Sequence, residues 1–163
     1  GHLHAESFKD DMRTFKALLP QDYFQIVLEI TERDMLNHRE ANSLFEWLHN
    51  EGFEIAIDDF GTGYSSLLYL KRLPACELKI DRAFVQELSG ESEDATIVSA
   101  IVALAKTLNL KVVAEGVETE AQQAFLTELG CNTLQGYLLG KPVSAQTIEA
   151  LCARGEMLPG AEQ

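Results

Sequence analysis

The chain has 163 residues, 46% of them hydrophobic, which is enough for one domain with a sizeable apolar core. Its 26 Asp and Glu outnumber its 13 Lys and Arg, giving a formal net charge of −13. Proteins that hold nucleic acid by its phosphates need a basic surface, so this charge argues against DNA binding. Divalent metals can still let an acidic protein bind a phosphate ester, so a metal site and simple solubility both stay open. No apolar run reaches the length, about 18 residues, that would cross a membrane.

The three cysteines are odd in number and widely spaced, at Cys76, Cys131 and Cys152, and no CxxC pair is present. We expect buried, reduced thiols of a cytoplasmic protein, in preference to zinc ligands or a catalytic thiol. The parent protein could still be anchored to a membrane elsewhere in its chain.

Helical patterns and short β-rich runs alternate along the chain. A helix over about residues 7–19 comes first and stops at Pro20. The runs predict strands at residues 24–30, 53–58, 77–81, 111–115 and 133–137. The first and fourth are apolar enough to be covered on both faces.

The helices between these strands are predicted from capping residues and apolar spacing. Asn37 with Glu40 begins one that ends at Gly52, and Thr119 with Gln122 forms a capping box for another that ends at Gly130. Two more helices are predicted, one opened by Glu93 and Asp94 and one capped by Ser144. In chain order, the apolar stripes of the four helices are Ala41, Leu44, Phe45 and Leu48; Ile97, Ile101, Leu104 and Leu108; Phe125, Leu126 and Leu129; and Ile148 and Leu151.

Strand–helix alternation of this kind predicts βαβ units and a parallel sheet. Five strands are too few for a closed barrel of eight, and a leading helix implies a strand before it. We therefore expect an α/β fold, an incomplete TIM-type (β/α) barrel comprising about the last two-thirds of the barrel. Residues 1–156 would form the partial domain, and residues 157–163 a frayed tail.

Polar groups recur at the carboxyl ends of these strands, which converge on one face of a barrel. They are Glu29, Asp58 with Asp59, Lys79 with Asp81, Glu115 and Gln135. Carboxylates brought this close need cations, and hard oxygen ligands suit Mg²⁺ or Mn²⁺. Two adjacent aspartates allow one of them to bridge two metals, the usual device for hydrolysing phosphodiesters. Any single one of these acids could instead be a helix N-cap or a solvated group, and residues 58–63 could be a turn with acidic caps.

Five strings in the sequence carry a family resemblance. They are residues 28–32 (Leu-Glu-Ile-Thr-Glu), 58–67 (Asp-Asp-Phe-Gly-Thr-Gly-Tyr-Ser-Ser-Leu), 79–85 (Lys-Ile-Asp-Arg-Ala-Phe-Val), 114–119 (Ala-Glu-Gly-Val-Glu-Thr) and 135–137 (Gln-Gly-Tyr). Because these five strings occur in this order, the chain resembles the EAL domain family, which hydrolyses the bacterial second messenger cyclic di-GMP to linear pGpG. The similarity covers about residues 8–152.

The resemblance implies a role for each matching residue. Glu29, Asp58, Asp59 and Glu115 resemble ligands of two Mg²⁺ or Mn²⁺ ions. Lys79 resembles the lysine that orients the attacking water, and Glu115 and Glu118 are expected beside it in catalysis. Gln135 resembles a supporting group, and Glu32 the anchor of a mobile loop. That loop, which in the family also lies near a dimer contact, is Phe60, Gly61, Thr62, Gly63, Tyr64, Ser65 and Ser66.

The strand with the Glu-Ala-Leu motif and the next strand, which carries an asparagine ligand, have no counterpart in this sequence, and Asn42 and Asn50 cannot substitute. We therefore expect the isolated chain to bind metal poorly, to be weak or inactive, and to self-associate as a homodimer or larger. A sensory or diguanylate-cyclase domain is expected upstream in the parent. Two alternatives stay open: a non-catalytic cyclic di-GMP receptor or protein-interaction module, and a metal-dependent lyase or isomerase on a similar barrel, which would not predict the string at residues 58–67.

Overall fold

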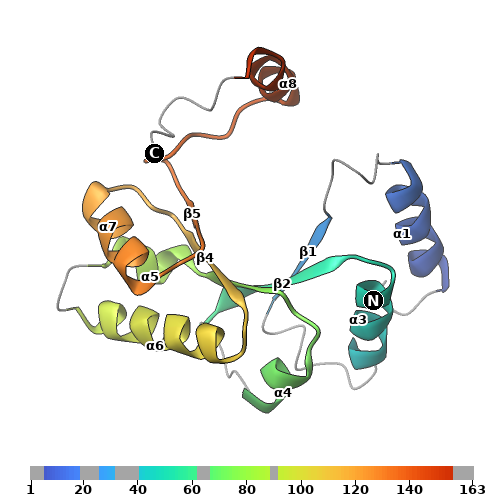
Figure 1. Cartoon of the computed structure of the whole chain (residues 1–163), viewed down its shortest axis with the longest axis horizontal. Coiled ribbons are helices and arrows are strands. Elements are labelled where there is room, and N and C mark those ends of the chain that lie inside the picture. Colours follow the sequence, from blue (N-terminus) through green and yellow to red (C-terminus); the bar gives the residue numbers. More distant parts are fainter. Residues whose placement is uncertain (1–5, 19–25, 32–40, 62–66, 89–91, 156–163) are drawn as a thin grey trace.

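The computed structural model describes residues 6–18, 26–31, 41–61, 67–88 and 92–155. Helices and strands alternate, and the parallel strands form one curved sheet (Figure 1). In chain order the elements are α1 (Glu6–Leu18), β1 (Val27–Thr31), α3 (Ala41–Asn50), β2 (Glu54–Phe60), α4 (Leu67–Arg72), β3 (Glu77–Ile80), α5 (Arg82–Gln86), α6 (Glu93–Thr107), β4 (Lys111–Glu115), α7 (Glu120–Leu129), β5 (Thr133–Gln135) and α8 (Ala145–Arg154).

The five strands lie in the sheet in the order in which they occur in the sequence, β1-β2-β3-β4-β5, and all are parallel. A doubly wound sheet reverses its strand order, whereas each strand here adds beside the one before it, as in a (β/α) barrel. Figure 1 shows the sheet as an arc with helices α3 to α7 around its outside. The predicted incomplete TIM-type barrel is confirmed.

The apolar core lies between this sheet and the surrounding helices. One row of strand side chains is fully buried against them: Ile55, Ile57, Leu78, Ile80, Val112 and Ala114. Leu44, Phe45 and Leu48 of α3 and Leu126 of α7 pack into the same core. Burying a large aliphatic side chain contributes about 1.5–3 kcal/mol, so this row accounts for much of the stability of the arc.

The opposite row of strand residues faces the inside of the arc and is largely polar. It carries Glu29, Glu54, Asp58, Lys79 and Glu115 beside the buried Ala56 and Val113. Coverage of both faces was predicted for the first and fourth strands. It holds for Val112, Val113 and Ala114, but Val27 on the edge strand β1 is 39% exposed.

The predicted strands agree with the observed ones to within a few residues, and β4 agrees fully. The short helices α4 and α5 were missed because neither is long enough to show an apolar stripe. In α6 the buried face is Ala95, Val98, Ile101, Val102 and Ala105 rather than the predicted stripe, of which only Ile101 is buried. Ala95 and Ala105, which the predicted stripe did not include, have small side chains that let α6 lie close to the sheet.

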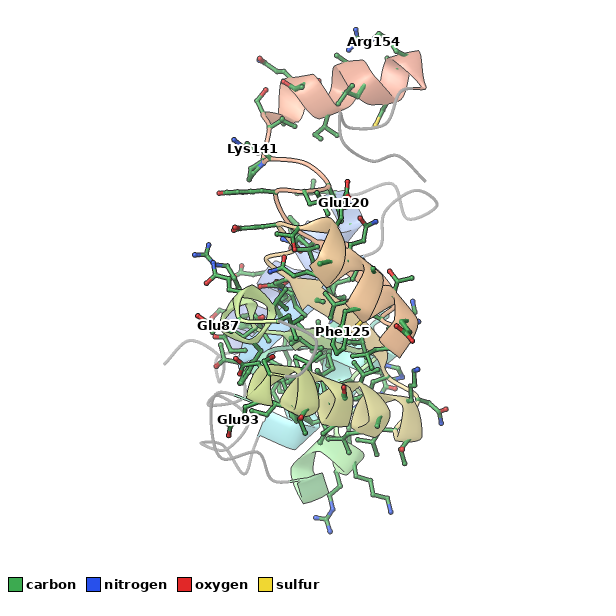
Figure 2. All side chains as sticks on the ribbon, turned by 90° about the vertical axis from the view of Figure 1, so that its left-hand side faces the viewer. Glu87, Glu93, Glu120, Phe125, Lys141 and Arg154 are labelled. Atoms are coloured by element: carbon green, nitrogen blue, oxygen red, sulfur yellow. The ribbon has the colours of Figure 1, made fainter. Side chains whose placement is uncertain are left out.

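The helix caps follow the sequence where the structure describes them. Thr119 and Gln122 form the predicted capping box of α7, and Gly130 ends that helix with positive φ. Ser144 caps α8 as predicted, although Ile148 is 40% exposed. Figures 1 and 2 show α8, which carries Arg154, standing apart from the sheet. The predicted cap at Asn37 and the tail at 157–163 lie outside the described residues. No helix among the described residues is both long and apolar enough to cross a membrane.

Candidate active site at the carboxyl ends of the strands

The lysine on β3 is the centre of the candidate site. The Nζ of Lys79 lies 2.7 Å from Oε1 of Glu29, 2.6 Å from Oε1 of Glu115 and 3.5 Å from Oδ1 of Asp58. The lysine is buried, whereas the side chain of Glu29 is 52% exposed and those of Asp58 and Glu115 are 23% exposed. Residues from β1, β2 and β4 therefore meet one cation on β3, as the strand-end pattern predicted.

The carboxylates keep this buried lysine protonated. Burial by itself lowers the pKa of Lys79, but its hydrogen bonds to Glu115 and Glu29 and the nearby Asp58 carboxylate outweigh burial and hold the pKa above its ordinary value. Lys79 is thus a fixed ammonium at neutral pH, and it can donate hydrogen bonds but cannot act as a base.

A β-bulge in β2 brings two adjacent aspartates to this site. Ile57 pairs with Leu78 and Phe60 with Ile80, so Asp58 and Asp59 together face the single residue Lys79 on β3. Asp59 has φ of 55°, a left-handed conformation that aspartate tolerates better than most residues. Its backbone N–H donates to Oδ1 of Asp58 over 3.0 Å.

The second aspartate lies among other acids. Burial, the Asp58 carboxylate and a hydrogen bond with the Asp81 side chain raise the pKa of Asp59, and the Glu115 carboxylate adds to the effect. Asp81 also caps α5, accepting a hydrogen bond from Ala83 N over 2.7 Å. The N-cap alternative that the sequence left open thus holds for Asp81.

Beside Glu115 is a depression of about 170 Å³, and two more of the predicted site residues, Glu118 and Gln135, line it. Its walls are Arg82, Glu115, Gly116, Glu118, Gln135, Gly136 and Tyr137. Gly136 cannot be replaced without strain, because a Cβ there would lie 2.0 Å from the carbonyl oxygen of Val117. The sequence reasoning missed Arg82, although it follows the predicted strand-end acid directly.

Phe60 is buried, and Gly61 lies against Phe84 and Ile101, so the first two residues of the predicted loop pack on α5 and α6. Glu32 and residues 62–66 lie outside the described residues, and their predicted roles stay predictions. Asn42 and Asn50 lie in α3, as the sequence indicated.

The four predicted metal ligands are not gathered into a ready cation cage. Within the described part of the chain, no three His, Cys, Asp or Glu side chains lie together in a way that could hold a metal ion. The ammonium of Lys79 lies where the oxygens of Glu29, Asp58 and Glu115 converge instead.

The cysteines take no part in the site. All three are free; the predicted burial is wrong for Cys152, which is exposed, while Cys76 and Cys131 are half-buried. Burial raises the pKa of the Cys131 thiol to about 11, and burial together with Glu54 raises that of Cys76. Raised pKa values leave little thiolate on Cys76 and Cys131 at neutral pH.

Fold and site together define a (β/α)-barrel domain with an acidic cluster around a lysine at the strand ends. The family model described as EAL domain matches residues 2–142. The chain therefore belongs to the EAL domain family.

Three relatives show the extent of the similarity. The bifunctional diguanylate cyclase/cyclic di-GMP phosphodiesterase MucR of Pseudomonas aeruginosa is 63% identical over 129 residues, 78% of this chain and 19% of that protein. A solved structure of PaMucR phosphodiesterase in a c-di-GMP complex has a TM-score of 0.81 and 55% identity, covering 90% of this chain and 60% of that one. The probable cyclic di-GMP phosphodiesterase PdeN of Escherichia coli is 53% identical over 142 residues, 87% of this chain and 27% of that protein. A manganese/cy-diGMP complex of Klebsiella pneumoniae BlrP1 has a TM-score of 0.73 and 31% identity, covering 85% of this chain and 36% of that one.

The chain thus spans about a fifth to a quarter of the length of the curated relatives it matches.

Proposed function

We propose that this chain is part of a domain that hydrolyses cyclic di-GMP to linear pGpG with the help of divalent metal ions. The proposal rests on one observation, the buried Lys79 ammonium held by Glu29, Asp58 and Glu115 at the carboxyl ends of four adjacent strands. Relatives named as cyclic di-GMP phosphodiesterases support the substrate.

The donor set fits a hard divalent cation. Its members are all carboxylates, which suit Mg²⁺ or Mn²⁺, and the ammonium of Lys79 shows that positive charge is stabilised at this position. Glu29, Asp58, Asp59 and Glu115 are the residues that would hold the metals. When bound, the ions supply Lewis acidity, which activates water and offsets the charge of the phosphodiester in the transition state.

Lys79 donates hydrogen bonds in this proposal. Its protonated state suits it to orient a water and to stabilise developing negative charge on the phosphate. Because Lys79 already carries its proton at neutral pH, it cannot accept another from the attacking water. That proton would therefore go to a carboxylate. Glu115 and Glu118, on either side of the Gly116 turn, are the candidates.

The substrate would extend over the depression beside Glu115. Gln135 and Glu118 on its walls can hold water and neighbouring ligands in place, and the ring of Tyr137 is 59% exposed there. We also propose two features of the whole protein. The first is that the domain acts as a homodimer, and the second is that the same chain carries other signalling modules. The name of MucR, a bifunctional protein of which this chain covers 19%, supports the second point.

The test is hydrolysis by the full-length protein that contains this chain, with Mn²⁺ or Mg²⁺ present. Asp58→Asn should lower the formation of pGpG by about 100-fold or more, the scale on which losing a charge-stabilising group acts. The matched control is Asp94→Asn in the first turn of α6, a residue that takes no part in the ion pairs of Lys79 and does not line the depression, and it should keep the activity. We expect the 163-residue chain alone to be slower than the full-length protein. Equal turnover by Asp58→Asn and the unmodified protein would refute the proposed role of the cluster.

A second function, a cyclic di-GMP receptor without hydrolysis, is favoured by a different observation. The described residues offer no group of three donors that could hold a metal ion. A receptor would bind cyclic di-GMP equally with and without Asp58→Asn and produce no pGpG in either case. Equilibrium dialysis combined with the hydrolysis assay separates the two functions.

A further inference from the structure

A buried glutamine in α7 links two walls of the depression. Gln122 is 6% exposed, and each end of its amide is hydrogen-bonded. Its Oε1 accepts from the backbone N–H of Glu118 over 2.8 Å and of Thr119 over 3.0 Å. Its Nε2 donates to the backbone carbonyl of Val85 over 3.0 Å. One side chain thus connects the loop after β4 with helix α5.

Each of these two segments carries part of the candidate site. The loop after β4 holds Glu115, Gly116 and Glu118, which form one wall of the depression. Helix α5 begins with Arg82, which forms another wall of the depression, and is capped by Asp81. The distance between the walls therefore depends on how α5 and the loop are held together.

The rest of the loop is held to β5 by its backbone. Val117 N donates to the carbonyl of Gln135 over 3.0 Å, and Leu138 N donates to the carbonyl of Val117 over 3.1 Å. Towards α5, the Arg82 side chain lies over Gly116, where a Cβ would be 2.3 Å from Arg82 Cγ. That contact limits how closely the walls approach, and the hydrogen bond from Gln122 to Val85 limits how far they separate.

The capping box does not account for this bond. Capping needs the bond between Gln122 N and the Thr119 hydroxyl and the bonds that Oε1 accepts from the loop. The Nε2–Val85 bond adds nothing to the cap, and it lies in the interior, where an unpaired donor or carbonyl would be costly.

We infer that Gln122 is a positioning residue that sets the spacing between the Arg82 wall and the Glu118 wall. This inference rests on the proposed function, since it assigns the spacing to the binding of cyclic di-GMP. In Figure 2, Glu120 marks the start of α7, the helix that carries Gln122, and Glu87 marks the C-cap of α5.

The first experiment measures amide hydrogen exchange in the unmodified chain and three variants. Gln122→Met removes both halves of the bridge, Gln122→Glu keeps an acceptor for the loop but loses the donor for Val85, and Gln123→Met is the matched control on the same helix. Both Gln122 variants should exchange about tenfold faster at Ala83 and Phe84 in α5, the size expected from losing a buried hydrogen bond. Val102 in α6 should be unchanged.

Unchanged exchange at Ala83 and Phe84, or an equal rise at Val102, would overturn the inference. The first result would mean that Gln122 does not hold α5, and the second that it only stabilises the whole fold.

The second experiment measures cyclic di-GMP binding to the same proteins in a calcium buffer. Both Gln122 variants should bind about tenfold more weakly, and Gln123→Met should bind within about twofold of the unmodified chain. Equal binding by all four proteins would overturn the inference. If neither the unmodified chain nor the full-length protein that contains it binds cyclic di-GMP, the proposed function fails, while the exchange data still decide whether Gln122 holds the two walls together.

Discussion

Replacing Lys79 by methionine tests whether one buried ammonium holds the strand-end carboxylates together. Methionine keeps a similar volume and removes the charge, so Glu29 and Glu115 lose a partner at 2.7 and 2.6 Å and Asp58 one at 3.5 Å. Breaking a buried ion pair in this way costs about 3–5 kcal/mol. The Glu29 side chain is 52% exposed and the other two are 23% exposed, so water offsets part of the loss. We therefore expect a loss of about 2 kcal/mol in the free energy of unfolding.

For a chain of this size, about 2 kcal/mol corresponds to roughly 4–8 °C in Tm. Thermal unfolding with EDTA present measures it. The control is Lys111→Met, at an exposed position on β4, which should change Tm little. Mg²⁺ should then raise the Tm of Lys79→Met more than that of the unmodified chain, because the three carboxylates have lost their internal cation.

Two results would refute this reasoning. A Lys79→Met variant as stable as the unmodified chain would show that the carboxylates do not depend on the ammonium. An equal loss in Lys111→Met would show that the effect does not depend on the carboxylates that contact Lys79.

The remaining predictions concern a crowded turn and a half-buried thiol. Gly116→Ala should lower the free energy of unfolding by about 3 kcal/mol, because φ is +74° and the new Cβ would meet the Arg82 side chain. Gly155→Ala, at φ of +65° with nothing within 4 Å, should cost only about 1 kcal/mol, and urea unfolding compares the two. Iodoacetamide at pH 8 should modify the exposed Cys152 well before Cys131, as peptide mass spectrometry would show. Burial raises the pKa of Cys131 from 9.0 to about 11, so the folded state retains a proton that the unfolded state loses. Stability should therefore fall as the pH rises from about 9 to about 11, and a Cys131→Ser variant should lack this part of the pH dependence.

Local signals in the sequence predicted the scaffold well. The strand at residues 111–115 was predicted correctly because all its central residues are apolar and buried. The capping box at Thr119 and Gln122 is a contact over three residues, so it can be read directly from the sequence. The recurring strand-end acids predicted that Glu29, Asp58 and Glu115 would meet, which the ion pairs with Lys79 confirm.

Long-range contacts set the limit of that prediction. Gln122 was read as a capping residue, and nothing local shows that its Nε2 bonds to Val85, 37 residues away. Asp81 was counted with the strand-end acids, although the short helix α5 makes it an N-cap. The placement of Asp59 beside Asp58 also depends on a bulge against β3, because neighbours in a regular strand point to opposite faces.

That bulge also changes which residues of β2 face the core. Before it, Ile55 and Ile57 pack outward against the helices, and Ala56 between them faces inward. After it the alternation is reversed, so Phe60, which would otherwise point inward, is 4% exposed and pairs with the buried Ile80. The extra residue between Ile57 and Phe60 therefore places a second acid beside Lys79 and still leaves Phe60 paired with Ile80. Deleting one of the two aspartates would restore regular alternation and leave a single acid beside Lys79, while the phenyl ring would stay in the core.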